Sequence, residues 1–192
     1  MKRRCGGSAS VWMLMVVLLL LGTALGVAHV GGASGDYVRR QVAADASVLA
    51  GAQVLAERLG HIARLQRFGQ EALEGGDMQT AQKASEAAWL IAVGTPEAVR
   101  SEVQSAAEGN GGKRWSLLGA SKDWFIQVPS GQGEWAWVGL ASDFGTRRLT
   151  ASLWFPTLAG EERPADSSAW VQGGAGGALL DEDWRARRVS TP

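Results

Sequence analysis

The most regular feature of the hydrophobic pattern is an uninterrupted apolar run near the start of the chain. From Val11 to Val30 the sequence contains no Lys, Arg, Asp or Glu. A helix rises ~1.5 Å per residue, so this run matches the ~30 Å hydrocarbon core of a bilayer. Inside a helix every backbone group has a partner, as a lipid environment requires. The run therefore predicts a membrane anchor.

After the anchor, apolar residues recur at helical spacing. The stripe consists of Val38, Val42, Val48, Ala52, Leu55, Leu59 and Ile62. From Val48 onward the steps alternate between four and three, which predicts an amphipathic helix. This helix must bury its stripe against its own distal domain or against a neighbouring subunit. The small residues of 31–35 precede it, either as a flexible break or as part of one long helix.

Alanine-rich segments punctuated by glycine predict two further helices. Asp77 is a good N-cap for a helix over 78–93, because its carboxylate can accept from free backbone N–H groups. Thr95 is expected to cap another helix that begins with Pro96, a residue favoured at the first helical position, and runs to about Ala107.

Beyond Lys113 the period of the pattern changes to two. Strands are predicted near 124–128, 134–140 and 146–155, with a weaker one near 169–172. The segment 134–140 is apolar on both faces, so we expect it in the centre of the sheet. The short connections favour an antiparallel meander.

These elements predict an α+β fold with a pilin-like outline. An N-terminal transmembrane helix continues into a long amphipathic helix, followed by two shorter helices and a small antiparallel β-sheet. The expected regions are a cytoplasmic tail, the anchor, an extracytoplasmic helical region, the sheet region, and a Gly-rich linker with a charged tail, over 1–10, 11–30, 31–112, 113–172 and 173–192.

Charges around the anchor predict its orientation. Lys2, Arg3 and Arg4 precede it without any acid, and the positive-inside rule places such an end in the cytoplasm. We therefore expect a single-pass protein of the cell membrane whose C-terminal region is periplasmic or extracellular. A cleaved signal peptide is the alternative, although the residues at 24–26 are a poor cleavage site and the apolar run continues past them.

Composition excludes several function classes. The chain has 19 Lys and Arg against 19 Asp and Glu. It therefore lacks the excess of basic residues that is typical of nucleic-acid-binding proteins. One cysteine and two histidines cannot supply a zinc site, and no nucleophile-elbow or phosphate-loop motif occurs. We therefore predict no catalytic residues, no metal ligands and no cofactor, and we do not expect an enzyme.

Tryptophan is the unusual aromatic choice here, with nine tryptophans against one tyrosine. Four in the predicted sheet region form a candidate binding surface for a glycan or a partner protein, since indole offers a large stacking area. They are Trp124, Trp135, Trp137 and Trp154, and Trp170 in the weaker fourth strand could line the same surface. The alternative is that they fill a small core in which much of the remaining volume is alanine.

The segment from Arg40 to Ala52, RQVAADASVLAGA, resembles a family signature. It is similar to the L-Q-N-A-A-D-A-A-A-L-A-G-A stretch of TadE/TadG-like proteins of the tight-adherence (Flp) pilus machinery, where it follows an N-terminal membrane helix. Two features depart from related patterns. Trp12 stands where pilin-type precursors carry the Glu that follows their processing site, and the D-x-S-x-S loop of large TadG-like proteins is absent.

The resemblance implies a non-enzymatic component of a tight-adherence pilus or related secretion system. The expected docking residues are Asp45, Ala46, Leu49, Ala50 and Gly51, since small residues let another helix approach closely. Expected partners are the membrane and other pilus-assembly or secretion proteins, with homo-oligomerisation through the N-terminal helix left open. The alternatives are an ordinary helix packed on its own domain, with Asp45 solvated, and an anchored extracytoplasmic module that binds through its tryptophan-rich sheet.

Overall fold

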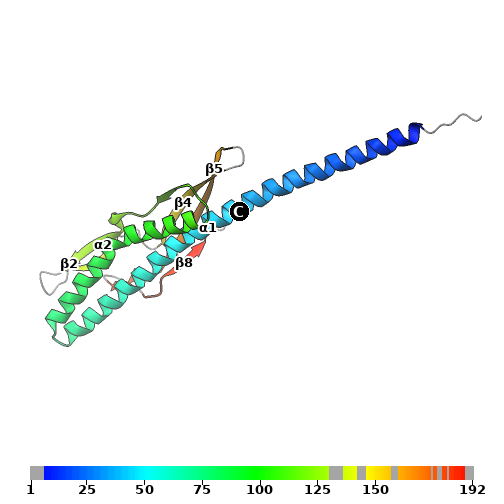
Figure 1. Cartoon of the computed structure of the whole chain (residues 1–192). Coiled ribbons are helices and arrows are strands. Elements are labelled where there is room, and N and C mark those ends of the chain that lie inside the picture. Colours follow the sequence, from blue (N-terminus) through cyan, green and yellow to red (C-terminus); the bar gives the residue numbers. More distant parts are fainter. Residues whose placement is uncertain are drawn as a thin grey trace, which may run out of the picture. The chain divides into compact units, whose positions relative to one another are not determined.

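The computed structural model describes a chain with two long helices and a set of antiparallel strands (Figure 1). The described residues are 7–129, 136–141, 146–156, 160–173, 175–176, 179–180 and 182–188. Helix α1 spans Gly7–Glu74, and helix α2 spans Met78–Gly109. Two compact units, Met1–Arg40 and Gln41–Pro192, divide the chain, and the division falls within α1.

The described part of the first unit is the N-terminal portion of α1. The large apolar side chains from Trp12 to Leu21 are 51–74% exposed, so they find no partner within the fold. By length and composition, α1 is a candidate membrane span. The glycines of 31–35 lie inside this helix, which agrees with the second of the two alternatives for that segment.

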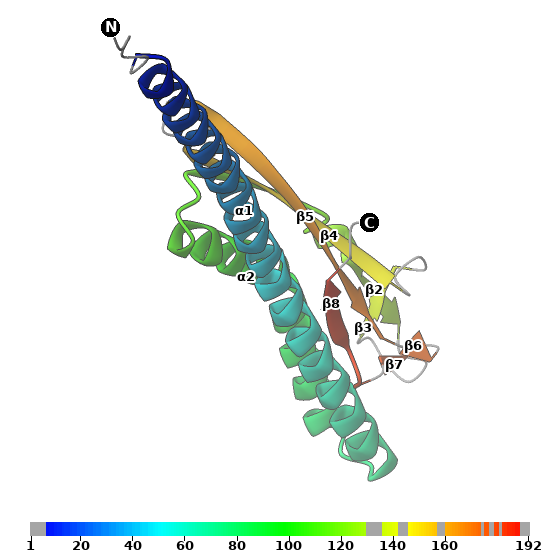
Figure 2. The same cartoon turned by 90° about the vertical axis from the view of Figure 1, so that its right-hand side faces the viewer.

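In the second unit, α1 and α2 form an antiparallel helical hairpin (Figures 1 and 2). Gly76 makes the turn with φ +78°, a conformation that glycine adopts without steric cost. Asp77 is the N-cap of α2, as expected, and accepts from the Thr80 backbone N–H at 3.0 Å and the Thr80 hydroxyl at 2.6 Å. These hydrogen bonds hold the pKa of Asp77 below its ordinary value. The cap therefore acts fully above the ordinary carboxyl pKa and weakens as the pH falls towards the lowered value.

The prediction of two separate helices after residue 77 was wrong, because α2 runs through Thr95 and Pro96 without a break. Thr95 does not cap a new helix. Its hydroxyl donates to the Ile91 carbonyl at 2.7 Å, one turn back in the same helix. Pro96 lacks an N–H and crowds the preceding turn, which bends a helix. Figures 1 and 2 show α2 changing direction partway along its length.

Within the described residues the strands form three antiparallel sheets, where a single meander was expected. The main sheet has the order β1-β4-β5-β8, and the two smaller sheets pair β2 with β3 and β6 with β7. The strands span Arg114–Leu118 (β1), Phe125–Pro129 (β2), Ala136–Leu140 (β3), Thr146–Pro156 (β4), Glu162–Gln172 (β5), Ala175–Gly176 (β6), Leu179–Leu180 (β7) and Arg185–Arg188 (β8).

Two strands differ from their expected places for a tertiary reason. Among the described strands, β3 pairs only with β2 and is therefore not central. It is apolar because Trp137 and Val138 are buried within the second unit. The expected charged tail contains β8, which pairs with the end of β5. The hydrophobic pattern did not predict this strand, because only Ala186 is apolar among its four residues and the other three are arginines.

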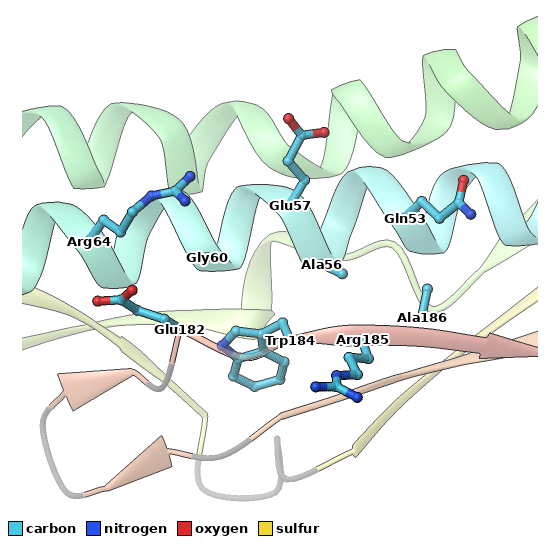
Figure 3. Close-up of a pocket in the computed structure, with 9 residues that line it drawn as sticks. All are labelled: Gln53, Ala56, Glu57, Gly60, Arg64, Glu182, Trp184, Arg185 and Ala186. Atoms are coloured by element: carbon cyan, nitrogen blue, oxygen red, sulfur yellow. The ribbon is translucent and has the colours of Figure 1, made fainter.

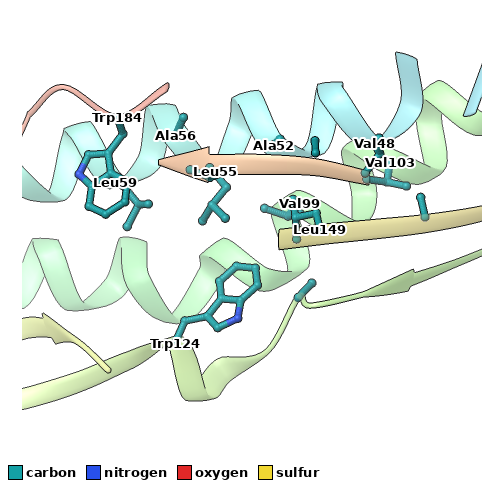
Figure 4. Close-up of a cluster of buried hydrophobic side chains, with 14 of the residues drawn as sticks. Val48, Ala52, Leu55, Ala56, Leu59, Val99, Val103, Trp124, Leu149 and Trp184 are labelled. Atoms are coloured by element: carbon teal, nitrogen blue, oxygen red, sulfur yellow. The ribbon is translucent and has the colours of Figure 1, made fainter. Parts of the chain in front are cut away.

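The core of the second unit lies between the helical hairpin and the main sheet. The predicted stripe from Val48 to Ile62 is fully buried, whereas Val38 and Val42 are exposed. Figure 4 shows α1, α2 and β4 contributing Leu55, Val99 and Leu149 to one cluster, with Trp124 beside it. Burial of these side chains is the main stabilising term of the unit, at ~25 cal/mol per Å² of apolar surface.

Candidate docking helix and sheet surfaces

Asp45 is buried against the main sheet and is not solvated. Its carboxylate accepts a hydrogen bond from the Ser167 hydroxyl of β5 at 2.5 Å and forms an ion pair with Arg188 of β8 at 2.5 Å. The Gln41 side chain also donates to this carboxylate, at 3.3 Å, and to the Asp166 carbonyl, at 2.9 Å. Asp45 thus connects α1 to two neighbouring strands of its own unit.

Gly51 packs against α2. A Cβ atom added at Gly51 would overlap the Val103 side chain and lie 3.4 Å from Cγ1 of Val99. The absence of a side chain therefore lets the two helices of the hairpin approach closely. Two of the five expected docking residues, Asp45 and Gly51, are used in packing within the chain.

The other three expected docking residues are accessible to different degrees. Ala46 is exposed, and Leu49 and Ala50 are half-buried. Val42 and Gln53 are also exposed, and the spacing of Val42, Ala46, Leu49 and Gln53 places these four residues in one row along α1. We call them the outer row. It lies on the part of α1 that the core of the second unit does not cover.

An open groove runs between α1 and the C-terminal segment (Figure 3). It has a volume of about 510 Å³ and is lined by Gln53, Ala56, Glu57, Gly60, Arg64, Glu182, Trp184, Arg185 and Ala186. An ion pair of 2.9 Å between Arg67 and Glu182 holds the segment beside the helix. A Cβ at Gly60 would lie 3.4 Å from the Glu182 carbonyl oxygen, so the backbones approach closely here.

Gln66 is a buried polar residue that the sequence pattern did not reveal. Its amide nitrogen donates to the Val138 carbonyl of β3, and its carbonyl oxygen accepts from the Leu180 N–H of β7 at 3.0 Å. One side chain of α1 thereby holds both small sheets in place. The only available signal was a polar residue four positions after Ile62 on the apolar stripe.

The four candidate binding tryptophans do not form one surface. Trp124 and Trp137 are buried in the second unit, and the Trp137 ring lies against Gly69 of α1, where a Cβ would overlap it. Trp154 is half-buried, and the Arg114 guanidinium lies 5.3 Å from the centre of its ring. Trp135 lies outside the described residues. A buried indole cannot stack on a ligand, so among the described members only Trp154 reaches the surface.

The described residues offer no constellation for metal chemistry. No group of three or more His, Cys, Asp or Glu side chains within them could hold a metal ion. His61 lies 4.0 Å from Glu57, one turn away on an exposed face of α1. This is the spacing at which two side chains of a helix can form an ion pair.

The comparisons with known proteins identify one region of the chain. Residues 7–54 match the family model described as "Putative Flp pilus-assembly TadE/G-like". This confirms the resemblance for the N-terminal part of α1 and for the signature around Asp45, about a quarter of the chain. No curated protein and no solved structure matches the chain.

Proposed function

We propose that this chain is a membrane-anchored, non-enzymatic component of a tight-adherence (Flp) pilus or a related secretion system. The observation that carries the proposal is the family match over residues 7–54, which joins the exposed apolar part of α1 to the signature segment. The rest of the chain is then an extracytoplasmic domain that the anchor holds at the membrane.

The domain docks onto other assembly proteins through α1. Because Asp45 and Gly51 hold α1 on its own sheet and hairpin, the docking contact uses the outer row together with Ala50. Small side chains at Ala46 and Ala50 allow a partner helix to approach closely, and Val42 and Leu49 provide apolar contact. Asp45 and Gly51 support this face from the inside.

Enlarging Ala46 is expected to weaken assembly without unfolding the domain. Ala46→Leu adds volume to a close helix contact, where overpacking costs typically ~1–3 kcal/mol, so association should weaken about fivefold to 150-fold. The measurement is co-purification of the full chain with its neighbouring assembly proteins, together with far-UV circular dichroism.

Two variants make this test specific. Ala46→Ser keeps the side chain small and should retain association. Gly51→Ala should instead lower the thermal stability of the domain, because its methyl group meets Val103 inside the chain. Undiminished co-purification of Ala46→Leu would remove the outer row from the docking contact.

The charges before the anchor support a cytoplasmic N-terminus and an extracytoplasmic domain. A phosphatase reporter fused after Pro192 should therefore be active, since this enzyme functions only outside the cytoplasm. If the phosphatase fusion were inactive, and a reporter enzyme that works only in the cytoplasm were active at the same position, the proposed orientation would be reversed. A mature chain that begins near Val27 would identify the apolar run as a signal peptide, and mass spectrometry of the purified protein measures this directly.

A further inference from the structure

The solvent face of the main sheet carries an arginine–tryptophan–arginine row. Register pairs Arg148 of β4 with Trp170 of β5, and Trp170 with Arg187 of β8. Residues directly opposite each other in antiparallel strands project from the same face, so the three side chains form a line across three strands. At ~4.8 Å per strand, the two arginine backbones lie ~10 Å apart.

The row is fixed at one end by contacts within the sheet. The Arg148 guanidinium lies 5.7 Å from the centre of the Trp170 ring and donates to the Ser168 hydroxyl at 3.0 Å. Ser168 in turn lies 3.0 Å from the Thr150 hydroxyl. Arg148 and Arg187 are both exposed, and Trp170 is half-buried. The row is therefore an ordered, accessible set of donors with part of an indole between them.

The charge of this row is not neutralised within the described part of the chain. Two other arginines of β8 have acidic partners there, Arg185 with Asp183 at 3.0 Å and Arg188 with Asp45 at 2.5 Å. In that same part of the chain, neither Arg148 nor Arg187 forms an ion pair. Asp166, on the same face of β5, is four residues from Trp170, ~13 Å along the strand.

The same sheet face contains a second arginine–tryptophan pair that differs in one respect. Arg114 lies over Trp154 and also forms an ion pair with Glu162 at 2.5 Å. Its charge is already balanced within the chain. The contrast between the two pairs indicates that the stacking is a shared structural feature, whereas the unbalanced charge is particular to the row.

We propose that Arg148, Trp170 and Arg187 bind an acidic polysaccharide. Guanidinium groups match carboxylates with paired hydrogen bonds, and the exposed part of an indole packs on the C–H face of a sugar ring. The hydroxyl of Thr150 and the exposed amide of Gln172 flank the row and suit sugar hydroxyls. An open sheet face spanned by separated cations fits an extended chain with repeated acidic groups. This inference is independent of the proposed role in pilus assembly.

The test is a titration of the full chain, in neutral detergent, into fluorescently labelled polygalacturonate, followed by anisotropy. Saturable binding is expected, with an affinity that falls as salt screens the charges. Arg148→Gln combined with Arg187→Gln should weaken binding about tenfold or more. Trp170→Leu should also weaken it, whereas neutral dextran should not bind.

Matched variants separate a site from general positive charge. Arg187→Gln and Arg114→Gln each remove one positive charge from the same sheet face, yet only Arg187→Gln should reduce affinity. Equal losses in the two variants would overturn the proposal, because they would show that net charge alone attracts the polymer. Arg187 lies on an exposed edge strand, so its substitution tests the site even where Arg148→Gln lowers stability.

Competing ligands define the class of molecule. If polyglutamate bound with the same dependence on Arg187 while polygalacturonate did not bind, the ligand would be an acidic protein segment. The same result with phosphatidylglycerol vesicles would identify a lipid surface instead. If inorganic phosphate, at the same concentration of negative charge, competed as well as unlabelled polygalacturonate, the row would be a simple anion site and the proposal would be wrong. Loss of assembly in Ala46→Leu with retained polymer binding would show that the two surfaces act separately.

Discussion

Replacing Trp124 by alanine is expected to cause a large loss of stability and to leave no specific binding defect. The indole is 2% exposed within the core of the second unit. Trp-to-Ala substitutions in cores cost ~3–5 kcal/mol, because they remove buried surface and leave a cavity. The Arg147 guanidinium, 5.9 Å from the ring centre, would also lose this aromatic contact. Urea unfolding of the full chain in neutral detergent, followed by circular dichroism, measures the change.

Trp154→Ala is the control for this prediction. Trp154 is half-buried on the solvent face of the sheet, and its main polar contact is the stacked Arg114. Such exposed cation–π contacts contribute ~0.5–1 kcal/mol, so the variant should stay close to the parent in stability. If Trp124→Ala unfolded no more easily than Trp154→Ala, Trp124 would not belong to the core, and a binding role for it would return.

Replacing Asp45 by alanine should destabilise the second unit by ~2–3 kcal/mol. The carboxylate accepts from Ser167 and pairs with Arg188, and hydrogen bonds to charged groups contribute ~1.5–3 kcal/mol. Arg188 is half exposed, so water can replace part of its ion pair and the loss stays below that of a fully buried pair. Thermal unfolding of the full chain measures the loss.

Asp45→Asn separates the two contacts of the carboxylate. Asparagine can still accept from Ser167 but cannot pair with Arg188 as a charge, so we expect a smaller loss, of ~1 kcal/mol. Hydrogen exchange should show the change mainly in β8 and the end of β5, the strands that Asp45 holds. Unchanged stability in Asp45→Ala, with failed assembly, would instead place Asp45 in a contact between proteins.

The second prediction also bears on the meaning of the family signature. The signature is explained in part by packing inside the chain, since Gly51 of α1 packs against α2 and Asp45 of α1 contacts the main sheet. Within the signature, the side chains of Val42, Ala46, Leu49 and Ala50 remain for the proposed contact with a partner. The signature therefore combines folding of the domain on one face of α1 with the proposed docking on the other.

Sequence alone determined the features that depend on local periodicity and on chain chemistry. The apolar run, the buried stripe from Val48 to Ile62 and the Asp77 cap are all read from residues close together in the chain. The α+β class followed from the change of period after Lys113. The resemblance around Asp45 was likewise a local signal, and the family match over residues 7–54 confirmed it.

Only the tertiary structure decided which faces of these elements are used. The sequence did not predict β8, because its arginines are typical of a solvated segment. Its partners, β5 and Asp45, lie more than a dozen residues away along the chain. Gln66 appeared as an ordinary polar residue because its partners, Val138 and Leu180, lie far along the chain. Pro96 remains inside one helix because packing of Val99 and Val103 offsets the local cost of proline. Local sequence specifies backbone preference and amphipathicity, whereas hydrogen bonds and burial between distant segments depend on contacts that exist only after folding.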